Sequence, residues 1–250
     1  HRSLAYEMLH NAMIGPVGVG NPFFTAFLHG FRLSCVGGTL DLYDVSYFYG
    51  GVEEFVQSSE TSVIKDLNDL SFEIKVDLEA VHLNELADVF AEAGPFFEGK
   101  IFEDIFNDFL EGTGAPCPQL LHAIRDRFNQ QINLAEITSS TFRLKLLCWS
   151  TTGAPRIIQE GNPIRVILVE DSDPHYISST TPNEEHDRYI GSGTCSFKTC
   201  TRSCRIPASF LIKLLCSSYD PLSECKDART AIHHWLLVQM LDAIGCYTTI

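Results

Sequence analysis

Apolar residues recur at helical spacing in several stretches of the chain. The clearest example covers residues 81–111, where apolar side chains return every three or four positions and acidic side chains lie between them. A break at Gly94 and Pro95 divides this stretch into two amphipathic helices, the second with its acidic residues, Asp108 among them, on the face away from the core. Further helices are predicted over residues 116–128, 141–149, 208–216 and 227–244.

After residue 135 the pattern of apolar residues changes from mainly helical to a mixture of helical and strand-like segments. Residues 164–169 form a run of β-branched and apolar side chains between two turn sequences, which predicts a buried strand. A second strand region, interrupted or bent at its cysteines, is predicted over residues 197–206. Residues 178–187 are polar and predict a loop.

This change of character is the best candidate for a domain boundary. We expect an α+β fold with a helix-rich N-terminal lobe over residues 1–135. A smaller mixed α/β C-terminal lobe would cover residues 136–250, after a hinge near residues 133–140. A chain of 250 residues is long enough for two medium-sized domains.

Composition narrows the classes of partner. Hydrophobic residues make up 45% of the chain and charged residues 20%, which is ordinary for a packed protein and argues against disorder. The formal net charge of −14, with no basic stripe, argues against nucleic-acid binding. No apolar run approaches the roughly 18 residues that a membrane span needs, so we expect no membrane partner.

The nine cysteines are scattered, and their number is odd. This favours a reducing, intracellular location, in the cytoplasm or the nucleus, over a disulfide framework. Cys195, Cys200 and Cys204 cluster downstream of His186, but their spacing suits no common zinc knuckle. We therefore expect neither a metal site nor a cofactor.

Cys200 is the candidate nucleophile. Lys198 and Arg202 stand two residues to either side, and cationic neighbours favour the thiolate, which is the reactive form of cysteine. Thr199 and Thr201 add hydroxyl groups that could donate to a developing oxyanion. The alternative is a strand cysteine with a packing role only.

Three landmarks follow one another in the second half of the chain. A predicted helix runs into residues 147–153, which end in Thr-Gly; the pair Thr199-Cys200 is followed seven residues later by Pro207; and Tyr247, after an Ala-Ile pair, is fourth from the end. In this order the landmarks resemble the C-terminal lobe of HECT-type ubiquitin ligases. The resemblance covers about the last 110 residues.

That resemblance implies a bilobal HECT-like transferase. Cys200 would accept ubiquitin from a ubiquitin-conjugating enzyme as a thioester and pass it to a lysine of a protein substrate. Thr199 would flank the nucleophile, and Tyr247 would position the C-terminal tail near it. The helix-rich lobe would dock the conjugating enzyme.

Departures from the family pattern keep two alternatives open. The family's Leu-Pro upstream of the Thr-Cys pair is replaced by Gly193-Thr194-Cys195, and the stretch after Pro207 is longer than usual. Both features favour a catalytically inactive HECT-like domain that serves protein interaction. A cysteine hydrolase that pairs Cys200 with His233 or His234 is the third interpretation.

Overall fold

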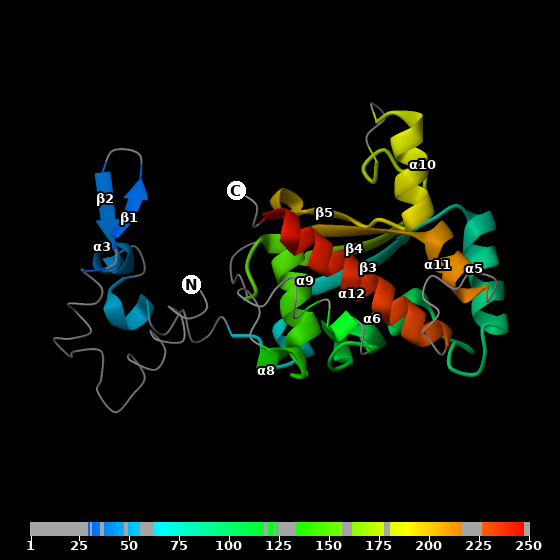
Figure 1. Ribbon diagram of the computed structural model, residues 1–250, viewed down its shortest axis with the longest axis horizontal. Coiled ribbons are helices and arrows are strands. Elements are labelled where there is room, and N and C mark those ends of the chain that lie inside the picture. The colour runs from blue at the N-terminus through cyan, green and yellow to red at the C-terminus, as the bar shows by residue number, and fades with distance from the viewer. Residues whose placement is uncertain are drawn as a thin grey trace. The chain divides into compact units, whose positions relative to one another are not determined.

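The structure is a computed structural model, and the described part of the chain forms two compact units (Figure 1). One contains residues 1–63 and 128–133, and the other contains residues 64–127 and 134–250. The residues described are 30, 32–35, 38–47, 50–55, 63–117, 120–122, 124, 134–156, 162–177, 181–216 and 227–247, with the backbone alone at 32–40, 134–135 and 245–247.

The first unit contains a small hairpin followed by a helix. Strands β1 (Arg32–Cys35) and β2 (Gly38–Asp41) pair antiparallel, and α3 (Leu42–Tyr47) begins directly after β2. Asp41 and Asp44 cap the N-terminus of this helix. The side chain of each accepts a hydrogen bond from the backbone N–H of the other, at 2.8 and 3.1 Å.

The second unit is built on a four-stranded mixed sheet with the order β3-β4-β6-β5. Its first three strands are parallel, and β5 runs antiparallel to β6. The strands are β3 (Phe72–Asp77), β4 (Ile164–Val169), β5 (Ser196–Lys198) and β6 (Ser203–Pro207).

Helices supply the connections of this sheet (Figure 1). Between β3 and β4 lie α5, α6, α8 and α9, together with the helical residues 120–122 and 124, and α10 lies between β4 and β5. Two more follow β6. The helices are α5 (Ala80–Glu92), α6 (Phe102–Glu111), α8 (Leu134–Ile137), α9 (Phe142–Thr152), α10 (Asn183–Ser192), α11 (Ala208–Leu215) and α12 (Ala228–Tyr247). No helix of the described chain is both long and apolar enough to cross a membrane.

Alternation along the strands divides the buried side chains between the two faces of the sheet. Val166 and Leu168 of β4 pair with Cys204 and Ile206 of β6, and all four are at most 1% exposed. On the opposite face of β4, Val169 forms a hydrophobic cluster with Tyr176 and Ile177, and Ile167 and Ile190 pack against this cluster.

Most predicted elements are confirmed, including the mixed helix and strand content. The strand over 164–169 and the helices on either side of Gly94 lie where the pattern placed them. Helix α9 ends as expected at Gly153, whose φ of +81° lies in the left-handed region that favours glycine. The predicted helix over residues 116–128 lies only partly within the described residues.

Two predictions are corrected. Residues 183–187 of the predicted polar loop belong to helix α10. Glu184 and Glu185 lie in its first turn, where negative charge favours a helix despite the polar composition. The boundary near residue 135 does not match the division of the structure. Strand β3 of the first half pairs along its full length with β4, so residues 64–127 belong to the same unit as the second half.

Candidate functional site

Cys200 lies in a one-turn 3-10 helix, η2 (Thr199–Thr201), which connects strands β5 and β6. Its side chain is exposed, as the prediction of an accessible thiol requires. Among the six free cysteines described, only Cys200 and Cys216 are exposed; the other four are buried. The turn lies at the amino end of β6, immediately before the strand enters the sheet.

Hydrogen bonds fix the conformation of this turn. Arg202 adopts a left-handed conformation, with φ of +48°, and its N–H donates to the Thr199 carbonyl at 3.3 Å. Arg165 of β4 donates from its guanidinium to the Thr201 carbonyl at 3.4 Å. The hydroxyls of Thr201 and Ser203 lie 2.8 Å apart, so the Thr201 hydroxyl is already hydrogen-bonded within the turn.

Cationic side chains lie on both sides of Cys200, and backbone carbonyls hold them in place. The Lys198 ammonium donates to the His175 carbonyl at 2.7 Å, and the Arg202 guanidinium donates to the Asn162 carbonyl at 3.3 Å. Both cationic groups are thus anchored to backbone outside the turn that carries Cys200.

The neighbouring cysteines have a different environment. Cys195 and Cys204 are buried, and burial together with a hydrogen bond to Cys204 raises the pKa of Cys195 well above its ordinary value. In the described chain, no three His, Cys, Asp or Glu side chains form a group that could hold a metal ion. Burial also raises the pKa of Cys148 to about 12, so that thiol stays protonated at neutral pH.

The other two predicted site residues are placed only in part. Thr199 is half-buried at the start of η2, directly before Cys200. Tyr247 is the last residue of α12, and its side chain lies outside the described residues. The expected proximity of Tyr247 to Cys200 therefore stays a prediction.

The two histidines of the hydrolase alternative have other partners. His233 is buried on α12, where its Nε2 lies 2.9 Å from Asp108 and its Nδ1 lies 3.1 Å from the Arg143 guanidinium. Burial and the charge of Arg143 lower the pKa of His233 to about 4. The Nδ1 atom of His234 lies 3.3 Å from the sulfur of Cys117. Both imidazoles serve the packing of α12, and no contact described here links either to Cys200.

The sequence interpretation missed an ionisable pair at the other end of the sheet. His82 of α5 lies 2.8 Å from Glu170, which directly follows β4, and this hydrogen bond raises the pKa of His82. The position of Glu170 was a usable clue, because polar residues at the carboxyl ends of parallel strands often line ligand sites. His82 gave no such clue, because it follows β3, a strand that the pattern did not predict.

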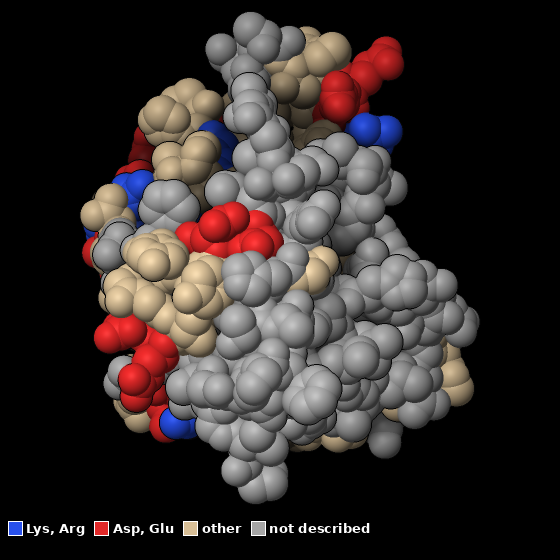
Figure 2. Space-filling model, turned by 90° about the vertical axis from the view of Figure 1, so that its left-hand side faces the viewer, with Lys and Arg blue, Asp and Glu red and all other residues tan. Residues whose placement is uncertain are grey.

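Among the coloured residues in the view of Figure 2, Asp and Glu side chains form several patches, and a few Lys and Arg side chains lie beside them. No family model matches the chain, and no curated protein or solved structure matches it either. The resemblance to HECT-type ligases therefore depends on the sequence landmarks.

Proposed function

We propose that this chain is a HECT-like ubiquitin-protein transferase module in which Cys200 carries ubiquitin as a thioester. The observation that carries this proposal is the exposed position of Cys200 in a hydrogen-bonded turn between two strands. The sequence around it supports the proposal further, since Lys198 and Arg202 stand two residues to either side of Cys200. Two of the sequence landmarks lie at the ends of elements: Gly153 caps helix α9, and Pro207 is the last residue of strand β6.

The chemistry consists of two acyl transfers. The Cys200 thiolate attacks the thioester carbonyl that joins ubiquitin to the conjugating enzyme, and the sulfur of that enzyme leaves as a thiolate. A lysine amine of the protein substrate then attacks the new thioester, loses a proton and forms an isopeptide bond. Cys200 leaves as a thiolate, ready for the next cycle.

The test is formation of a thiol-sensitive adduct by the full chain. The chain is incubated with activating enzyme, ATP, ubiquitin and a panel of conjugating enzymes, and is then analysed with and without reducing agent. We expect a ubiquitin adduct that reducing agent removes and that Cys200→Ala abolishes. Cys216→Ala is the matched control, because Cys216 is also exposed, and it should keep the adduct.

The competing function is protein interaction without catalysis. One observation favours it. The segment that replaces the family's upstream Leu-Pro begins at Gly193, and the carbonyl of this residue accepts a hydrogen bond from the Trp235 indole at 2.7 Å. The segment therefore has a structural role. Absence of an adduct with every conjugating enzyme, or an adduct that survives Cys200→Ala, would refute the transferase proposal. Binding of a conjugating enzyme without an adduct would support the interaction domain.

A further inference from the structure

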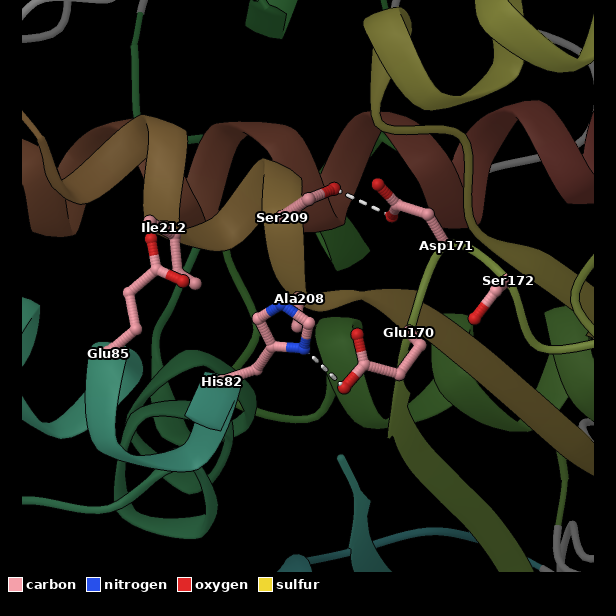
Figure 3. A pocket seen from close by; sticks show the side chains of 8 residues that line it. All are labelled: His82, Glu85, Glu170, Asp171, Ser172, Ala208, Ser209 and Ile212. Atoms are coloured by element: carbon pink, nitrogen blue, oxygen red, sulfur yellow. Dashed lines mark hydrogen bonds and ion pairs between the residues drawn. The ribbon is translucent and has the colours of Figure 1, made fainter. Parts of the chain in front are cut away.

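A pocket of about 380 Å³ opens at the carboxyl ends of β4 and β6 (Figure 3). Its walls come from the first two turns of α5 and α11 and from the segment that follows β4. The carboxyl ends of parallel strands are where open α/β sheets usually bind their ligands. The five residues of β6, on the order of 16 Å, separate this pocket from the Cys200 turn. The pocket is therefore a separate site and does not depend on the function proposed for Cys200.

One wall is an imidazole held by a carboxylate. The same oxygen of Glu170 lies 2.8 Å from Nδ1 of His82 and accepts the backbone N–H of Glu79 at 2.9 Å. The ring is thereby oriented so that its other nitrogen points toward the start of α11 (Figure 3). With Nδ1 directed at Glu170, the ring presents Nε2 to the pocket, as an acceptor when His82 is neutral and as a donor when it is protonated.

Two further carboxylates face the same space from different elements. Asp171 accepts the hydroxyl of Ser209 at 2.7 Å, which fixes it against the first turn of α11. Glu85 extends from α5 toward Ile212, on the other side of His82 in Figure 3. No Lys or Arg is among the described residues that line the pocket. Three of the six polar side chains that line the pocket are carboxylates, so its lining carries net negative charge even when His82 is protonated.

The remaining wall is apolar. Ala208 and Ile212 of α11 line it, and the volume is far larger than the roughly 15 Å³ that one water molecule needs. The described residues contain no cluster of His, Cys, Asp and Glu with the arrangement of a metal site. The pocket therefore matches a ligand with a charged donor at one end and a hydrocarbon stem, rather than a bare ion.

We propose that this pocket binds a primary ammonium or guanidinium group carried on an aliphatic stem. The carboxylates of Glu85, Glu170 and Asp171 accept its N–H groups, and Ile212 packs against the stem. Such a group occurs at the end of a Lys or Arg side chain of a partner protein, and it also occurs in a free diamine. The formal net charge of −14 attracts basic ligands of either kind.

Binding of small probes to the full chain tests this proposal by NMR. The cationic probes are 1,5-diaminopentane and the capped amides of lysine and arginine; capped norleucine amide is the uncharged match for lysine. We expect the cationic probes to shift the backbone amide signals of His82, Glu170, Asp171 and Ser209, and norleucine to leave them unchanged. Tighter binding of the capped amino acids would identify a protein side chain as the ligand, and tighter binding of the diamine would identify a small molecule.

A pair of variants on one helix locates the binding site. Glu85→Gln removes a pocket carboxylate from an exposed position and should weaken binding about tenfold, the loss expected for one charge-assisted hydrogen bond. Glu92→Gln, at the far end of α5, should leave affinity unchanged. The proposal is overturned if no cationic probe shifts these signals or if the two variants behave alike. Displacement of every probe by Mg²⁺ or Ca²⁺ at lower concentration would overturn it in favour of a metal site.

Discussion

Asp108 of α6 and His233 of α12 lie 125 residues apart in the chain, and Oδ2 of Asp108 is 2.9 Å from Nε2 of His233. Asp108 also receives two hydrogen bonds from Arg229, at 2.6 and 2.8 Å. On the far side of the imidazole lies the Arg143 guanidinium, which is 2% exposed and also donates to the Phe109 carbonyl. These contacts connect helices α6, α9 and α12 through one polar network.

We predict that Asp108→Ala destabilises the protein by about 1–3 kcal/mol, because it removes the acceptor for Arg229 and His233 and a negative charge that stabilises the buried Arg143 guanidinium. Burial opposes ionisation of Asp108, yet the hydrogen bond from Arg229 and the nearby His233 outweigh it and hold the pKa of Asp108 below its usual value. Urea unfolding at pH 7 measures the change. Glu111→Ala, an exposed acid on the same helix, is the control and should change stability by less than about 1 kcal/mol. Equal losses in the two variants would contradict the network.

Stability should fall as the pH drops from about 6.5 to about 4. The pKa of His233 is lowered to about 4 in the folded protein, whereas an unfolded histidine has a pKa of about 6.5. Between these values the unfolded chain binds the extra proton, so acid favours unfolding, by up to about 3 kcal/mol. Urea midpoints measured across this range test the slope. His233→Gln should flatten it, and an unchanged slope in that variant would assign the effect to other groups.

Gly193→Ala should destabilise the protein by about 3 kcal/mol or more. Gly193 has a φ of +63°, and an added Cβ would collide with the ring of Phe210. The left-handed conformation costs about 1–2 kcal/mol for alanine, and overpacking adds about 1–3 kcal/mol. Gly153→Ala is the matched control, since its φ is +81° with no atom within 4 Å of the added Cβ. It should lose only the conformational part, and thermal unfolding would show the difference.

Cysteine alkylation of the native protein should follow burial. We expect a maleimide to modify Cys200 and Cys216 rapidly, and Cys195 and Cys204 only when the protein unfolds. Peptide mass spectrometry at successive times distinguishes these sites. Protection of Cys200 under native conditions would remove the premise of the proposed transfer reaction, since a large donor must reach its sulfur.

The sequence alone located many of the elements. Residues 164–169 carry a β-branched apolar run between turns, and the structure has a strand with the same bounds. Residues 227–244 show the helical spacing of a core helix, and Trp235 and Met240 are buried in α12 as expected. These predictions succeed because a helix or strand with one buried face places its apolar residues at a regular spacing along the sequence.

Other elements were hidden because their stabilising contacts are remote. Strand β3 is a short edge strand of mixed polarity, whose hydrogen bonds come from β4 more than 80 residues later. Asp108 has the spacing of a solvent-facing acid on α6, yet its partners Arg229 and His233 belong to α12. No local pattern records a contact of that separation.

For the candidate sites, the sequence determined which residues could act, and the tertiary structure decided where each one lies. The motif around Cys200 and its cationic neighbours is continuous in the chain, so its chemistry could be inferred from the residues. Exposure of that thiol and burial of Cys195 and Cys204 depend on how β5 and β6 enter the sheet. The pocket between His82 and Glu170 exists only because parallel pairing of β3 and β4 brings their carboxyl ends together.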